Sequence, residues 1–229
     1  MPLSLEDRKN ILEYCDRDLP TTEWYLDQFD FIEQDALRRR LALEFYAARY
    51  LYKLGEALKV SGQHMHKHVK FQIIQYASLY EAVIVYLLWN RFSEHNAVIS
   101  IQFHKVFRKA ATLPSSLVLT TSDSAAIFLC TEQLEKTSTM SIKFADKVDA
   151  AVSIGFLDHE LGNEIKELYN LRNALHLETV VKRAIKYEIE QAQLAYWRMQ
   201  PFIDGIKGYL RSGVLPDVAK IATKSAAND

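Results

Sequence analysis

The most apolar stretch of the chain, Lys70 to Phe92, most constrains the fold that it can adopt. It carries no charge from Ala82 to Trp89, and its apolar residues surround the helical axis almost completely. This pattern is typical either of a central buried helix or of a membrane span. The carboxylate of Glu81 would cost a lipid-facing span roughly 2 to 3 kcal/mol, and the stretch is shorter than the usual span of about 20 apolar residues. We therefore expect a central core helix.

Glu81 needs a partner in such a helix, because a buried carboxylate is costly unless it is paired or hydrogen-bonded. Arg172 is the cation that we expect to pair with it. Exposure of Glu81 to water is the alternative.

Arg172 belongs to a second segment, Leu157 to Glu178, in which leucines repeat at the helical period of about 3.6 residues. Arg172 and His176 are four positions apart, so a helix places them one above the other at the edge of the leucine stripe. Tyr169 and Asn173 fall in the same arc. The sequence therefore predicts a polar strip beside an apolar one, and this strip is its best candidate for chemistry.

Composition favours a globular, helix-rich chain, because 49% of the 229 residues are hydrophobic, 25% are charged, and there are only 7 Gly and 5 Pro. The formal net charge of -1 gives no overall basic field, so any contact with RNA or DNA must come from a local patch. Cys15 and Cys130 are far apart, and the charged start, Ser4 to Asn10, lacks the apolar core of a signal sequence. We expect a cytoplasmic protein with reduced thiols.

Further helices are expected from periodicity and from capping residues such as Ser4 and Asp158. They run over Leu5–Arg17, Phe31–Val60 (closed by Ser61-Gly62), Ser93–Ala111, Ser141–Val152 and Val180–Leu210 (interrupted at Pro201 and stopped by Gly213). Two β-prone runs, Leu117–Thr121 and Ala126–Cys130, predict a small inserted hairpin. Because two strands alone are marginally stable, we expect this hairpin to lie on the helices.

Two charged or polar motifs invite a functional interpretation. The basic run Arg38-Arg39-Arg40 is interpreted as the solvated face of a long helix rather than as a phosphate site. His64, His66 and His68 alternate, but alternate residues of a helix point about 200° apart and cannot close on one ion. A polar connector is the favoured interpretation, and a zinc or nickel site is the alternative.

The chain as a whole is thus expected to be all-α, a helical bundle with a small inserted β-hairpin. We expect residues 1–62 to form an N-terminal helical extension, residues 63–213 to form the bundle, and residues 214–229 to form a flexible tail.

Three features together resemble a known family. They are the long apolar helix with Tyr80-Glu81-Ala82, the helix–hairpin–helix middle, and Leu171-Arg172-Asn173-Ala174-Leu175-His176 just before a last long helix. In these features the chain resembles the HEPN superfamily of helical bundles, over about residues 70–211. The usual signature of that superfamily is an arginine, often followed by asparagine or aspartate, and a histidine after four to six intervening residues. Here only three residues separate Arg172 from His176.

The resemblance implies a metal-independent endoribonuclease without a cofactor, of the kind common in toxin-antitoxin and anti-phage systems. It also implies a homodimer in which two motifs face each other, with RNA as substrate and an antitoxin or other regulatory protein as a further partner. Two copies of His176 would then serve as base and acid, and two copies of Arg172 would hold the phosphate. Asn173 would orient the phosphate, Tyr169 would stack a base or simply pack, and Glu81 would support Arg172.

Two other interpretations stay open at this point. Arg172 and His176 could bind Glu81 and backbone carbonyls and only stabilise the packing of two helices. The chain could also be a non-catalytic HEPN-type module that binds RNA, a nucleotide or a protein partner. Some toxin-type relatives carry a modifiable tyrosine two residues after the histidine, where this chain has Glu178. No glycine-rich phosphate loop, paired zinc cysteines or Gly-x-Ser-x-Gly elbow appears in the sequence.

Overall fold

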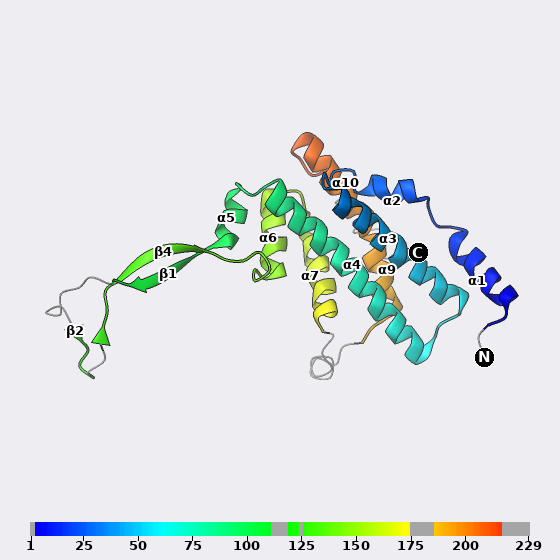
Figure 1. Cartoon of the computed structure of the whole chain (residues 1–229), viewed down its shortest axis with the longest axis horizontal. Coiled ribbons are helices and arrows are strands. Elements are labelled where there is room, and N and C mark those ends of the chain that lie inside the picture. Colours follow the sequence, from blue (N-terminus) through cyan, green and yellow to red (C-terminus); the bar gives the residue numbers. More distant parts are fainter. Residues whose placement is uncertain (1–2, 111–118, 124–125, 175–185, 217–229) are drawn as a thin grey trace.

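The computed structural model describes residues 3–110, 119–123, 126–174 and 186–216. Within these residues the chain is mainly helical, and a two-stranded ribbon extends away from one end of the bundle (Figure 1). The helices are α1 (Leu5–Asp16), α2 (Thr22–Gln28), α3 (Asp35–Ala57), α4 (Gly62–Asn90), α5 (Asn96–Gln102), α6 (Phe144–Ile154), α7 (His159–Asn173), α9 (Ile189–Trp197) and α10 (Met199–Ser212). The strands are β1 (Phe103–Lys109), β2 (Leu119–Thr120), β3 (Ala126–Ile127) and β4 (Cys130–Lys136).

Helix α4 is the central element, as its sequence predicts, and it packs against α3, α6, α7 and α9 (Figure 1). By length and composition it could cross a membrane, but 61% of its most apolar window is buried inside the protein. Tyr80, Ile84 and Leu87 are completely inaccessible to solvent. Full burial of one large apolar side chain contributes about 1.5 to 3 kcal/mol, so α4 supplies much of the stability of the bundle.

The N-terminal helices join the same core. The side chain of Ser4 caps α1 by accepting a hydrogen bond from the backbone N–H of Asp7 at 3.1 Å, as predicted. Helix α2 was not predicted from the sequence; it is capped by Thr21 and buries Tyr25. Together with Phe45 of α3, this tyrosine belongs to the cluster of buried residues that α4 forms with the later helices. The described part of the expected N-terminal extension therefore shares one core with α4.

The turn between α3 and α4 differs from the prediction. Helix α3 ends at Ala57 rather than near Val60, and Lys59 adopts a positive φ of 47°. Ser61 is the N-cap residue of α4, and Gly62 begins that helix with a φ of 56°. The pair that was expected to close one helix therefore opens the next.

The inserted hairpin is longer than predicted, and it does not lie on the helices. Only Asn96–Gln102 of the expected helix Ser93–Ala111 is helical, and the following residues form β1. Strand β1 pairs in antiparallel fashion with β4, from Phe103 opposite Lys136 to Lys109 opposite Cys130, and β2 pairs with β3. The expected packing is wrong because most side chains of β1 and β4 are exposed and the ribbon extends into solvent (Figure 1).

The C-terminal segment also divides differently. The expected helix from Val180 to Leu210 appears as α9 and α10, which are separated at Arg198, while residues 180–185 lie outside the described residues. Pro201 lies in the first turn of α10, where the missing N–H of proline costs no helical hydrogen bond. Gly213 ends α10 with a φ of 70°, as predicted. Most of the expected flexible tail, from residue 217 onward, is outside the described residues.

Candidate functional site

Helix α7 begins at a cap that the sequence predicts. The Oδ1 atom of Asp158 accepts hydrogen bonds from the backbone N–H groups of Glu160 at 2.9 Å and Leu161 at 3.2 Å. The buried residues of α7 include Leu161, Ile165 and Leu168, so the predicted leucine stripe is the face that enters the core. Because α7 packs on α4, the residues at the edge of this stripe face the central helix.

The expected pairing of Glu81 with Arg172 is confirmed. Nη1 of Arg172 donates a hydrogen bond to Oε2 of Glu81 at 2.9 Å, and the hydroxyl of Tyr169 donates to Oε1 at 3.1 Å. The guanidinium carbon of Arg172 also lies 4.9 Å from the centroid of the Tyr169 ring. The side chains of Arg172 and Glu81 are 28% and 25% exposed, so the pair is half-buried.

Helix α6 completes the surroundings of this cluster. The ring of Phe144 stacks on Tyr169 with a centroid separation of 4.1 Å. Lys147 is buried, and its ammonium lies 5.7 Å from the centroid of the Trp89 ring. Burial lowers the pKa of Lys147, while the negative charge of Glu81 acts in the opposite direction. Burial and the charge of Glu81 raise the pKa of Tyr169, so its phenol remains a hydrogen-bond donor. Sequence reasoning did not identify Lys147 or Phe144.

Of the other two predicted site residues, Asn173 lies within the described residues and His176 does not. Asn173 is the last residue of α7, and its side chain acts to lower the pKa of the Tyr169 phenol, against the larger raising effect of burial and of Glu81. The backbone N–H of Ala174 still reaches the carbonyl of Asn170 at 3.1 Å. The helix that was expected to continue to Glu178 therefore ends at Asn173, and residues 175–185, with His176 and Glu178 among them, lie outside the described residues.

The arrangement suits an anion-binding arginine. Arg172 lies in the last turn of α7, where the helix carbonyls favour a positive charge. Glu81 holds the guanidinium through a hydrogen bond and Tyr169 contacts it through its ring, while the Arg172 side chain is partly exposed. A phosphate would have to share Arg172 with Glu81, because a bidentate contact uses two of the guanidinium N–H groups.

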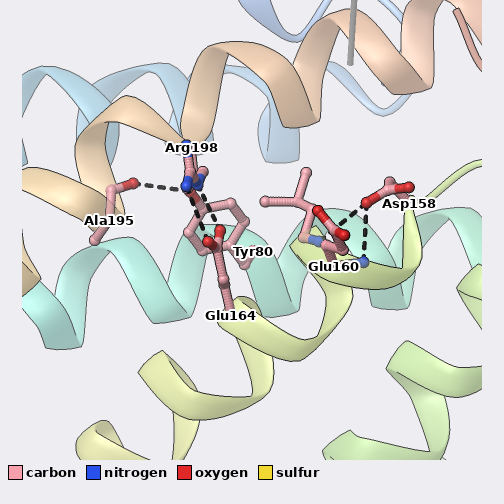
Figure 2. A network of polar contacts seen from close by, with 7 residues as sticks. Tyr80, Asp158, Glu160, Glu164, Ala195 and Arg198 are labelled. Atoms are coloured by element: carbon pink, nitrogen blue, oxygen red, sulfur yellow. Dashed lines mark hydrogen bonds and ion pairs between the residues drawn. The ribbon is translucent and has the colours of Figure 1, made fainter. Parts of the chain in front are cut away.

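A second polar network, around Arg198 and Glu164, was not predicted (Figure 2). Arg198, at the junction of α9 and α10, pairs with Glu164 of α7 through Nη2 and Oε1 at 2.9 Å and through Nε and Oε2 at 2.5 Å. The Arg198 side chain is only 6% exposed, and the contact with Glu164 raises its pKa. On α4, the hydroxyl of Tyr80 donates to the carbonyl of Ala195 at 2.8 Å. The sequence does indicate that Arg198 needs a partner, because Arg198 is a charged residue inside an apolar segment, as Glu81 is.

The three alternating histidines belong to α4 rather than to a connector, so that prediction is wrong. The ring of His66 contacts the ring of Tyr187 edge-on at 5.0 Å, and His68 lies close to Gly55 of α3. Among the described residues, no group of three or more His, Cys, Asp or Glu side chains is placed to hold a metal ion.

The basic run on α3 is a solvated face, as predicted. Arg38 and Arg39 form ion pairs with Asp35, one turn earlier on the same helix. Arg40 pairs with Glu44, one turn later.

A cavity of about 210 Å³ is lined by residues of α3, α4 and α9, with Arg49, Tyr52, Tyr76 and Tyr196 among them. The guanidinium carbon of Arg49 lies 5.0 Å from the centroid of the Tyr196 ring, a cation–π contact that closes one side of the cavity. Of the predicted site residues that the structure describes, none lines this cavity.

Comparisons with known proteins found no matching family model, no matching curated protein and no matching solved structure. The fold and the site define the class of the molecule only as a mainly helical bundle with a half-buried Arg172–Glu81–Tyr169 cluster between its central helix and α7.

Proposed function

We propose that the protein is a HEPN-like, metal-independent endoribonuclease that acts as a homodimer through Arg172 and His176. The observation that supports this proposal is the setting of Arg172. Its guanidinium is oriented by Glu81 and contacts the ring of Tyr169, and the Arg172 side chain as a whole is 28% exposed. A phosphate-binding arginine needs both a fixed orientation and access to the ligand.

The chemistry assigns a role to each residue. Cleavage by the 2′-hydroxyl needs a base for its proton, an acid for the leaving 5′-oxygen and positive charge for the phosphate. One His176 cannot stand on both sides of the phosphate, so the two protomers supply one each. An imidazole with an unperturbed pKa of about 6.5 is present in both forms near neutral pH. Arg172 binds the phosphate, Asn173 orients it, and Glu81 and Tyr169 position Arg172.

The proposed setting is a cytoplasmic toxin-antitoxin or anti-phage system in which an antitoxin or another protein restrains the enzyme. This part of the proposal rests on the resemblance of the Tyr80-Glu81-Ala82 helix and the Arg172 motif to the HEPN superfamily.

A second candidate is a HEPN-type module that binds RNA without cutting it. Both oxygens of Glu81 are occupied, one by Arg172 and one by Tyr169. In this candidate the carboxylate neutralises the guanidinium permanently, and the protein contributes binding alone.

Incubation of the protein with total RNA in excess chelator tests the proposal. We expect cleavage that leaves 2′,3′-cyclic phosphate ends, and its loss in His176→Ala and Arg172→Ala. Arg211→Ala is the matched control, because Arg211 also lies in the last turn of a helix but is exposed on α10. Light scattering records the oligomeric state of each variant.

Two results contradict the enzyme proposal. Cleavage that persists in His176→Ala removes that residue from the reaction. A folded dimer that binds RNA but never cuts it favours the second candidate.

A further inference from the structure

The β1–β4 ribbon has two chemically different faces. The register places alternate residues of each strand on a common face, since side chains of a strand alternate sides. One face carries Phe103, Lys105, Phe107, Lys109, Cys130, Glu132, Leu134 and Lys136. Its large apolar side chains are exposed: Phe103 by 37%, Phe107 by 66% and Leu134 by 67%. We name it the phenylalanine–lysine face.

On the phenylalanine–lysine face each large apolar side chain lies directly opposite a charged one. The pairs are Phe103 with Lys136, Leu134 with Lys105, and Phe107 with Glu132. Three lysines stand against one glutamate, so the face carries a formal charge of 3 − 1 = +2. The other face carries His104, Val106, Arg108, Thr131, Gln133 and Glu135. There Arg108 pairs with Glu135, and the formal charge is zero with His104 neutral.

This pattern suits a ligand that alternates flat apolar groups with negative charges. A single nucleic-acid strand has this chemistry, because its bases stack on aromatic rings while lysines contact its phosphates. A second copy of the same face would bring like charges together. An acidic membrane would attract the lysines, but the alternation leaves no continuous apolar surface on this face for insertion into lipid.

We propose that the phenylalanine–lysine face binds single-stranded RNA. Phe103 and Phe107 stack bases, and Lys105, Lys109 and Lys136 contact phosphates. The choice of RNA rather than DNA rests on the proposed function, whereas the single-strand chemistry follows from the face itself. Lys105 pairs with Glu132 at 2.8 Å, but both side chains are exposed, so a phosphate displaces this contact at little cost.

The ring of Phe128 extends this platform beyond β1. The ammonium of Lys109 lies 3.8 Å from the centroid of that ring, and Phe128 is 51% exposed. Lys109 is therefore in contact with an exposed aromatic ring, so a phosphate bound by it would lie next to a further apolar part of the platform.

Fluorescence anisotropy with a labelled single-stranded RNA of 12 nucleotides, in excess chelator, tests the proposal. The His176→Ala background is used so that bound RNA is not cut. We expect Phe107→Ser to weaken binding by about 5- to 100-fold, as the loss of one stacking contact does. Lys109→Gln should reduce the salt dependence of binding by about one unit of slope. Gln133→Ser, on the other face of the same ribbon, should leave the Kd unchanged.

Other results overturn the proposal. An unchanged Kd in Phe107→Ser, or no RNA binding by the parent protein, removes the ribbon as the binding surface. Equal affinity for single-stranded DNA of the same sequence overturns the choice of RNA. Binding to vesicles with acidic lipid that Phe107→Ser abolishes, while RNA binding is unchanged, assigns the face to a membrane. A dimer that Phe107→Ser dissociates without an effect on RNA binding assigns it to a second copy.

The two proposals can fail separately. Ribbon-dependent binding of RNA that the parent protein never cuts supports this inference and contradicts the ribonuclease. Cleavage by the parent protein with an unchanged Kd in Phe107→Ser supports the ribonuclease and contradicts this inference.

Discussion

Two arginine–glutamate pairs contact α7, and their burial separates their roles. The side chains of Arg198 and Glu164 are 6% and 25% exposed, whereas those of Arg172 and Glu81 are 28% and 25% exposed. A deeply buried arginine is held for structure, because its desolvation must be offset by partners inside the protein. The side chain of Arg172 is the more exposed of the two arginines. Arg172, and not Arg198, is therefore the residue to test for function.

Arg198→Ala should strongly destabilise the bundle. It leaves the half-buried Glu164 carboxylate without its bidentate partner, and removal of one member of a buried pair costs about 3 to 5 kcal/mol. Urea denaturation measures the free energy of unfolding. The double variant Arg198→Met with Glu164→Leu should recover most of the loss, because it removes both charges and keeps the volume. A loss below about 1 kcal/mol in Arg198→Ala would show that the pair is not the buried contact described above.

Helix α4 is the surface on which the other helices assemble. The close packing of α3 against α4 requires a glycine at position 55. A Cβ atom at Gly55 would lie 2.2 Å from Nε2 of His68 on α4. Burial lowers the pKa of His68, and its Nε2 atom has no hydrogen-bond partner among the described residues. The histidine ring thus fills the space that the missing side chain leaves, and the contact fixes how closely α3 approaches α4.

Gly55→Ala should therefore lower the free energy of unfolding by about 1 to 3 kcal/mol, the usual cost of overpacking. In a His68→Ala background the same substitution should become stabilising by about 1 kcal/mol, because alanine has a higher helix propensity than glycine. Thermal melting of the four proteins, followed by circular dichroism, gives the coupling. Equal effects in both backgrounds would contradict the contact.

The sequence predicted the presence of α3 and α4, but not the residues at which one ends and the other begins. Periodicity predicts α3 and α4, yet the turn between them uses Lys59 at a φ of 47°, a conformation that favours glycine and that no local signal marks. Asp158 and Gly213 were predicted as caps because their chemistry acts within one turn of the helix end.

At the scale of the whole molecule, the ribbon is attached to the bundle at one place. The backbone N–H of Thr137 donates to the carbonyl of Gln102 at 2.7 Å, so the two ends of the ribbon are adjacent. Beyond this point the side chains of β1 and β4 are mostly exposed, and the ribbon extends away from the helices (Figure 1). The bundle therefore owes little of its stability to the ribbon.

Replacement of residues 103–136 by a short Gly-Ser linker should leave the bundle folded. We expect helical circular dichroism to be retained, with a change in Tm of at most about 5 °C, because few buried contacts are lost. Thermal melting measures this, and the single variant Phe107→Ser is the matched control with an intact ribbon. Loss of cooperative unfolding in the replacement would show that the ribbon is part of the core.

The sequence alone determined the features that depend on residues within one or a few helical turns, or on the need of a buried charge for a partner. The apolar period specified α4 as the core helix, Asp158 marked the start of α7, and the cost of burying Glu81 identified Arg172 as its partner. Only the tertiary structure decided that Phe103–Lys109 is a strand, because its pairing with Cys130–Lys136 depends on contacts between distant residues. The same holds for the Arg198–Glu164 pair, whose members are 34 positions apart and meet only when the helices pack.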